Sequence, residues 1–325
     1  MNSKRNSESI ENTPQTTSLL PKGHDSYYYE EWPEKDVLGL RVQQHGKEIK
    51  LITYRHPVDT QQCEKKAVVF YIHGYGGYCE RISYMFKHLA AAGYECFGLD
   101  QRGFGKSEGE RAWLESQELI YSDLWLFIFT TIQKFNINLQ KTPLFLLGKS
   151  FGGLLSFNLS SELPSMFRGM ALCVPFFGEY GNSIEKNAWV FKTLDYIYPR
   201  KEFSSSSLKP DMEKSDYYQK YKHYFTDSNL VTQAKSRTLL IFLKEHEKAK
   251  QILNQNQAKI PTLFIIAGKD NVISNTAIDE VYKRMYNCKN KLVRYEEADH
   301  TTITVDNDYA REMAQDIIKY FDSLL

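Results

Sequence analysis

Residues 142–157 read TPLFLLGKSFGGLLSF: an apolar stretch, a Gly-Ser-Gly turn and a second apolar stretch. The turn, GKSFG, matches G-x-S-x-G, in which a serine stands on a sharp bend between a strand and a helix and exposes its hydroxyl above a sheet. Glycines flank such a serine because strand and helix pass too close there for side chains. The stretch therefore predicts a strand that ends at Gly148, a helix from Phe151 and a nucleophile at Ser150.

A second match, GKSEG, occupies residues 105–109. Here the strand ends near Leu99, polar and glycine-rich residues intervene, and EGER follows, so Ser107 is predicted to be a loop residue. The repeated GKS also resembles the end of a phosphate-binding loop, G-x-x-x-x-G-K-[ST]. The required first glycine is missing in both copies, because those positions hold Asp100 and Pro143.

Short apolar strands alternate with helical stretches on both sides of the turn. The predicted strands cover residues 67–72, 94–99, 143–148, 169–177, 260–268 and 291–297. The predicted helices cover 80–92, 116–135, 151–161, a stretch from about 275, and about 307–325. A hairpin is predicted over 37–56. This alternation predicts an α/β fold with a mostly parallel sheet covered by helices on both faces.

The alternation of strands and helices stops over residues 178–258. This segment contains the run SSSS and a helical stretch, TLLIFLKEHEKAKQIL, without a strong strand pattern. About 80 residues far exceed an ordinary connection. We therefore expect a helical cap at 178–258, inserted into a core made of 27–177 and 259–325. Residues 1–26 are polar and lack periodicity, which predicts a disordered tail.

The composition excludes several classes of protein. The 41 Lys and Arg residues balance the 40 Asp and Glu residues, which gives no reason to expect a nucleic-acid partner. The five cysteines are scattered and form no C-x-x-C, so neither a zinc site nor a disulfide framework is indicated. The first residues lack the apolar core of a secretory signal. These features predict a cytoplasmic protein, and an apolar cap is compatible with peripheral contact with a membrane.

A serine nucleophile needs a histidine to take its proton and an acid to orient that histidine. In this architecture the order along the chain is Ser, Asp or Glu, then His. His300, in EEADHTTI, follows a C-terminal strand, and Asp270 follows IPTLFIIAGK. We predict that His300 is the base and Asp270 the orienting acid.

Other candidates fit less well. His223 and His246 lie in charged stretches of the predicted cap and are expected on the surface. Asp299 is the direct neighbour of His300, so its carboxylate would have difficulty reaching that ring. Asp279 falls within a predicted helix.

The tetrahedral intermediate carries an oxyanion that needs fixed N–H donors. The amide of Phe151, at the start of the helix, is one predicted donor. The turn HGYGG, at 73–77, follows the strand AVVFYI and predicts the amide of Tyr75 as the second. Loss of one donor would cost about 3 kcal/mol of transition-state stabilisation. Glycines of such a turn can also serve its shape alone.

Five motifs together carry a resemblance to a family. They are HGYGG (73–77), LDQRGFGKSEGER (99–111), GKSFGG (148–153), AGKDNVI (267–273) and ADHT (298–301). Over about residues 38–325, the chain resembles the monoacylglycerol lipase and lysophospholipase branch of the α/β-hydrolases. The resemblance implies a serine hydrolase of single-chain lipid esters that needs no metal or cofactor. It implies the triad Ser150, Asp270 and His300, oxyanion amides at Tyr75 and Phe151, and an apolar acyl tunnel in the cap.

One position departs from that branch, and other functions stay open. The residue before the nucleophile is commonly His or Glu, but here it is Lys149. This cation could alter substrate preference, lower the pKa of His300 by like-charge repulsion, or point to solvent.

Another esterase, a thioesterase or an acyltransferase would use the same residues. A hydrolase fold kept as a non-catalytic binding module is disfavoured because all triad positions are filled; the tail's protein partner is unknown.

Overall fold

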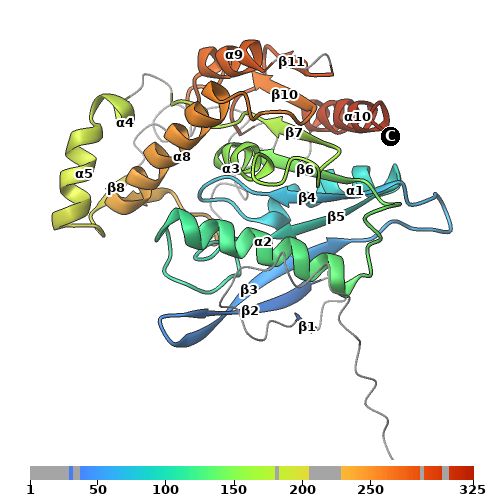
Figure 1. The fold of residues 1–325 in the computed structure, drawn as a ribbon, viewed down its shortest axis with the longest axis horizontal. Helices are drawn as coiled ribbons and strands as arrows, with labels where there is room; N and C mark the ends of the chain where they lie inside the picture. The colour runs from blue at the N-terminus through green and yellow to red at the C-terminus, as the bar shows by residue number, and fades with distance from the viewer. Residues whose placement is uncertain (1–28, 32–36, 180–182, 205–227, 286–288, 302–306) are drawn as a thin grey trace, which may run out of the picture.

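The computed structural model describes residues 29–31, 37–179, 183–204, 228–285, 289–301 and 307–325 (Figure 1). The predicted tail at 1–26 therefore lies outside the described residues. Within them, one nine-stranded sheet has the order β1-β2-β3-β5-β4-β6-β7-β10-β11.

The sheet is antiparallel at one end and parallel through the rest. Its strands are β1 (Tyr29–Glu31), β2 (Val37–Gln44), β3 (Lys47–His56), β4 (Ala67–Ile72), β5 (Tyr94–Leu99), β6 (Leu144–Lys149), β7 (Gly169–Cys173), β10 (Thr262–Ala267) and β11 (Lys291–Tyr295). The pairs β1–β2, β2–β3 and β3–β5 are antiparallel. From β5 through β11 every pair is parallel, which confirms the predicted mostly parallel sheet.

Helices cover both faces of the sheet because the strand residues alternate between two apolar cores. Val68 and Phe70 of β4 belong to the core under α2 (Gln117–Lys134), α3 (Phe151–Ser160) and α9 (Asn275–Arg284). Val69 and Tyr71 belong to the core under α1 (Ser83–Ala91) and α10 (Asp308–Asp322). A 3-10 turn, η1 (Cys79–Ile82), precedes α1. The α/β-hydrolase architecture predicted from the sequence is confirmed.

The segment between β7 and β10 contains helices and a small second sheet. Its elements are α4 (Ser183–Lys186), α5 (Ala188–Ile197), β8 (Glu202–Ser204), β9 (Gln233–Lys235) and α8 (Ser236–Asn254). Strands β8 and β9 pair in antiparallel orientation. The sequence pattern gave no sign of them, because three residues are too few to establish an alternation. Figure 1 shows α5 at the outer edge of the molecule, away from the nine-stranded sheet.

Helix α8 is hydrogen-bonded to the core through one buried carboxylate, that of Glu245. Glu245 is fully buried and accepts hydrogen bonds from Tyr121 Oη at 2.5 Å, Gln117 Nε2 at 2.8 Å and Asn158 Nδ2 at 2.7 Å. These partners come from α2 and α3. A buried carboxylate is stable only with such partners, so the contact specifies where α8 lies on the core.

Four cysteines lie in the described part of the chain, and none is in a disulfide. Cys79, Cys96 and Cys173 are buried, and Cys63 is half-buried. Among the described helices, none combines the length and the apolar character needed to cross a bilayer.

Candidate active site

Ser150 stands on a strained bend between β6 and α3. Its backbone has φ 53° and ψ −122°, and such conformations cost of order 1–3 kcal/mol in a non-glycine residue. Its N–H donates to Cys173 O at 2.9 Å, which ties the bend to β7. The flanking glycines are required by space: a Cβ on Gly148 would lie 2.4 Å from Ser156 Oγ, and one on Gly152 would lie 2.1 Å from Ile72 O.

The imidazole of His300 lies between Ser150 and Asp270. His300 Nε2 is 3.1 Å from Ser150 Oγ, and His300 Nδ1 is 2.7 Å from Asp270 Oδ2. Ser150 follows β6, Asp270 follows β10 and His300 follows β11, so three parallel strands end at the same edge of the sheet. The structure thus brings together the three residues that the sequence singled out. With the Nδ1 proton on the Asp270 side, Nε2 is free to accept the serine proton.

Asp270 is held as a carboxylate. Its Oδ1 accepts the N–H groups of Val272 and Ile273, each at 2.8 Å. Burial raises the pKa of this carboxyl, but the hydrogen bond and charge of His300, together with the two amides, outweigh burial and lower the pKa overall. An ionised Asp270 can therefore orient the ring and stabilise it when it is protonated.

The residues that the sequence analysis rejected as the orienting acid or the nucleophile have other partners in the structure. Asp299 Oδ1 accepts from the backbone N–H and the hydroxyl of Thr301, within its own loop. Asp279 lies on α9 and pairs with Arg294 at 2.9 Å. Ser107 is also a structural residue: it is buried, and its hydroxyl oxygen accepts the N–H of Ile52 at 2.7 Å.

The expectation for His246 is wrong. His246 is buried, and its Nε2 lies 2.8 Å from Phe176 O. It falls on the inner face of α8, four residues after Phe242 and three before Ala249, so helical spacing could have identified it. Burial lowers its pKa, which favours the neutral ring. His223 lies outside the described residues.

The two predicted oxyanion donors belong to segments that adjoin Ser150. Phe151 is the first residue of α3, and Tyr75 follows β4 in the turn 73–77. Within the described part of the chain, neither backbone N–H has a hydrogen-bond partner. The turn lies directly on the serine: a Cβ on Gly74 would be 3.0 Å from Ser150 Cβ.

Two side chains that the sequence reading missed brace this turn. His73 Nε2 accepts the N–H of Gln101 at 2.8 Å, and Gln101 Nε2 donates to His73 O at 2.8 Å. His73 Nδ1 lies 2.8 Å from Gly74 O, so this nitrogen carries the proton. Burial lowers the pKa of His73 to about 4. His73 is the first residue after β4 and Gln101 the second after β5, so both stand at the ends of adjacent parallel strands, which is the signal that could have paired them.

Lys149 ends β6 beside the nucleophile and is half-buried. Burial and the neighbouring charge of Arg81 lower its pKa to about 7, while Asp270 and Asp299 act in the opposite direction. Its side chain is neither fully exposed nor fully buried, and its effect on the pKa of His300 stays a prediction. Its effect on the substrate stays a prediction.

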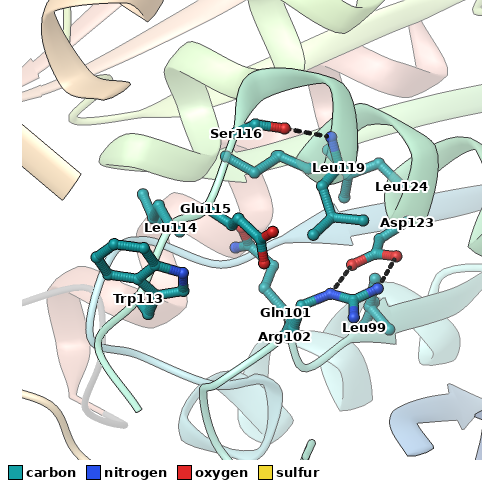
Figure 2. Close-up of a pocket in the computed structure, with 11 residues that line it drawn as sticks. Leu99, Gln101, Arg102, Trp113, Leu114, Glu115, Ser116, Leu119, Asp123 and Leu124 are labelled. Carbon is teal, nitrogen blue, oxygen red and sulfur yellow. Dashed lines mark hydrogen bonds and ion pairs between the residues drawn. The ribbon is translucent and has the colours of Figure 1, made fainter. Parts of the chain in front are cut away.

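Figure 2 shows a small cavity that does not belong to this site. The Arg102 guanidinium and the Asp123 carboxylate face each other beside it, at 2.8 and 2.9 Å. Its volume of about 20 Å³ has room for about one water molecule. A second, open groove is lined mainly by the α2–β6 connection, the α3–β7 connection and the last two residues of the chain, also without Ser150. The acyl tunnel stays a prediction. No cluster of potential metal ligands occurs among the residues described.

Comparison with known proteins gives consistent matches. The profile of the family described as serine aminopeptidase, S33 (Hydrolase_4) matches residues 63–308. A monoglyceride lipase homolog of monkeypox virus is 25% identical over 236 residues, 72% of this chain and 82% of that protein. The mouse monoglyceride lipase is 30% identical over 161 residues, 47% of this chain and only 50% of the mouse protein.

Solved structures share the fold. A soluble variant of the Saccharomyces cerevisiae monoglyceride lipase superposes with a TM-score of 0.73 at 18% identity, covering 94% of this chain and 99% of that one. The Paleococcus ferrophilus monoacylglycerol lipase gives 0.70 at 18% identity, covering 85% and 99%. At this level of identity the likeness establishes the fold alone.

Proposed function

Because this chain belongs to the serine aminopeptidase S33 family, and is an ester hydrolase of the monoglyceride-lipase-like serine type, we propose that it cleaves esters of single-chain lipids, monoacylglycerol or lysophospholipid. We further propose that Ser150, His300 and Asp270 perform the reaction. The observation that carries the proposal is the single imidazole that lies within hydrogen-bond distance of both the Ser150 hydroxyl and the Asp270 carboxylate.

In the first half of the proposed reaction, Ser150 Oγ attacks the ester carbonyl while His300 Nε2 takes its proton. The carbonyl π electrons move to the oxygen, and the amides of Phe151 and Tyr75 stabilise the charge. Collapse of the tetrahedral intermediate breaks the bond to the alcohol, which leaves with the proton from His300. Asp270 stays ionised and holds the imidazolium.

In the second half, a water molecule attacks the acyl-enzyme. His300 takes a proton from the water, the oxyanion forms again in the same place, and the fatty acid leaves as Ser150 regains its proton. Every proton that moves passes through one nitrogen, His300 Nε2.

The choice of a lipid ester rests on the relatives. The mouse and rat proteins are monoglyceride lipases, as is the yeast protein whose fold this chain shares. The family description also names aminopeptidase activity. The test should therefore offer both substrate classes.

The decisive experiment labels the purified protein with a fluorophosphonate probe and maps the modified peptide. We expect label on Ser150, and hydrolysis of a monoacylglycerol or a lysophospholipid but not of an aminoacyl anilide. The variant Ser150→Ala should lose both signals. The matched control is Ser107→Ala, the serine of the second G-x-S-x-G, which should still take the label. Label on Ser107, or none on a folded protein, would refute the proposal.

We also propose that the chain is cytoplasmic and contacts membranes through α5. Trp189, Tyr196 and Ile197 are 71%, 91% and 55% exposed. They fall on one side of the helix, at spacings of seven and eight residues, and Tyr198 follows at 65% exposed. Trp and Tyr have an apolar body and a polar tip, which suits the headgroup region of a bilayer. Lipid substrates are held in such a bilayer.

Sedimentation with phosphatidylcholine vesicles tests this contact. The double variant Trp189→Ala/Tyr196→Ala should stay in the supernatant while the wild-type protein pellets. Tyr309→Ala is the control, because Tyr309 is also an exposed aromatic residue, at 39%, but lies on α10. Equal pelleting of all three proteins would refute a role for α5.

A further inference from the structure

We propose that the side chains of Tyr75 and Phe242 are positioning residues, which fix the spacing of the two oxyanion amides and make it depend on the chain segment 229–242. The inference rests on the proposed function, since it concerns the same oxyanion site. It assigns a role to side chains, whereas the predicted donors are backbone groups.

The hydroxyl of Tyr75 reaches two backbone carbonyls that belong to other parts of the chain. Tyr75 Oη lies 2.7 Å from Gln233 O, on β9, and 3.1 Å from Ala112 O. Ala112 O also accepts from Thr238 Oγ1, at the start of α8, at 3.1 Å. Burial raises the pKa of Tyr75, so its phenol stays protonated and can donate. The phenol has one proton, and the shorter contact is the one to Gln233 O, so the hydroxyl links the oxyanion turn mainly to β9. The longer contact, to Ala112 O, connects it to α8 through an acceptor shared with Thr238.

A single ring of α8 touches the side chains of both predicted donor residues. The ring of Phe242 lies 5.2 Å from that of Tyr75, edge-on at 88°, and 4.8 Å from that of Phe151 at 55°. The ring of Phe104 also contacts that of Tyr75, at 5.1 Å between centroids. Edge-to-face contacts of this kind favour one arrangement of the rings. The ring of Phe242 thus packs between Tyr75 and Phe151, the two residues whose backbone amides must both point at the oxyanion.

The backbone of the turn is also joined to this segment. Gly76 O accepts the N–H of Val231 at 3.0 Å. Gly76 has φ +77°, and a Cβ there would lie 2.1 Å from Val231 O, so the two chains are in direct contact. On the other side, Gly74 packs on Ser150. A shift of residues 231–233 must therefore move a turn that already touches the nucleophile.

This arrangement makes transition-state stabilisation depend on where β9 and α8 lie. An oxyanion donor works only if it is already in place when charge develops, and misplacement by about 1 Å can cost about 10²-fold in rate. Ground-state binding of the acyl chain does not need the amide. Loosening the turn should consequently lower kcat and leave KM nearly unchanged.

The test compares Tyr75→Phe, which removes only the hydroxyl, with the wild-type protein on a soluble p-nitrophenyl ester. The second readout is inhibition by an alkyl trifluoromethyl ketone, whose carbonyl carbon bonds to Ser150 Oγ and whose oxygen becomes an oxyanion. We expect kcat to fall about tenfold and the inhibition constant to rise by a similar factor, with KM within about twofold. Phe242→Leu should change the same two quantities. Tyr320→Phe is the matched control, because Tyr320, on α10, also donates to a backbone carbonyl, that of Lys289.

The outcomes separate this inference from the proposed function. A wild-type protein that neither hydrolyses esters nor takes the fluorophosphonate label overturns both. An active wild-type protein, with Tyr75→Phe unchanged in kcat and in trifluoromethyl ketone affinity, overturns this inference alone. So does an equal loss in Tyr320→Phe, since that would indicate general loosening. If Tyr75→Phe does not fold, Phe242→Leu decides: a wild-type kcat overturns the inference, and a tenfold loss at unchanged KM supports it.

Discussion

Replacing His73 by glutamine should make the protein less sensitive to acid. His73 is buried, and its neutral ring accepts from Gln101 N–H through Nε2 while its other nitrogen faces Gly74 O. Protonation of the ring would place a proton on Nε2, which would then face the N–H of Gln101 as a second donor and could no longer accept its hydrogen bond. Glutamine keeps an acceptor oxygen and a donor nitrogen but does not titrate.

The magnitude follows from the two pKa values. In the native protein the pKa of His73 is about 4, against 6.5 for an ordinary histidine. Below pH 6.5 the unfolded chain binds more protons at this site than the native chain, so stability falls as the pH falls from 6.5 towards 4. Integration between pH 7 and pH 5 gives a loss of about 2 kcal/mol from this one group.

Urea unfolding of wild type and His73→Gln at pH 7 and pH 5 measures the effect. The quantity of interest is the drop in the free energy of unfolding between the two pH values, which should be about 2 kcal/mol smaller in the variant. His88→Gln, on the exposed side of α1, is the control and should retain the wild-type drop. If His73→Gln shows the same drop as wild type, His73 titrates normally and the proposed bracing of the oxyanion turn by a neutral ring is refuted.

Three further predictions concern the same edge of the sheet. Asp270→Asn should lower kcat about 10⁴-fold with the fold retained, since the imidazole loses its orienting carboxylate; a loss below about tenfold in steady-state assays would contradict its role. Gly152→Ala should cost about 3 kcal/mol in urea unfolding, because its Cβ would meet two backbone oxygens at 2.1 and 2.4 Å; Gly46→Ala, with open space but φ +75°, should cost clearly less. Burial raises the pKa of Asp100 to about 6 from 3.8. The native state then binds that proton more tightly than the unfolded chain, so the contribution of this group to stability falls as the pH rises from 3.8 to 6. The pH dependence is opposite to that of His73, whose contribution falls as the pH falls. Asp100→Asn should lack this contribution. Between pH 4 and pH 7 its free energy of unfolding, measured in urea, should therefore lose about 2 kcal/mol less than that of the wild-type protein.

The sequence predicted the core of the fold because its strands are short, apolar and separated by helices of full length. Ser116 was chosen as the start of a helix, and its side chain caps α2 by accepting from Leu119 N–H. The site residues were found for a related reason: the ends of parallel strands meet at one edge, so Ser150, Asp270 and His300 could be assigned to that edge one by one. The structure places them within hydrogen-bond distance; their catalytic roles stay a prediction.

Contacts between segments far apart in sequence could not be predicted in the same way. The burial of His246 was missed because charged neighbours on the outer face of α8 hid the apolar face, and the partners of Glu245 lie about 90 to 130 residues away. The contact between Tyr75 and Phe242 is of the same kind. A single sequence carries the type of each side chain but not the pairing that packing creates.

The buried carboxylate of Glu245 has a consequence for how substrate could reach Ser150. Swinging α8 away would strip that carboxylate of its three donors and expose the apolar face around Phe242, so this helix is a poor hinge. Residues 231–233 hold the oxyanion turn as well, so a movement that admits substrate is expected in α4 and α5 rather than in β9 or α8. Grafting a cap from another hydrolase onto this scaffold should therefore keep residues 229–258 of this chain, so that β9 and α8 retain their contacts with the oxyanion turn and the core, and should replace only residues before Asn229.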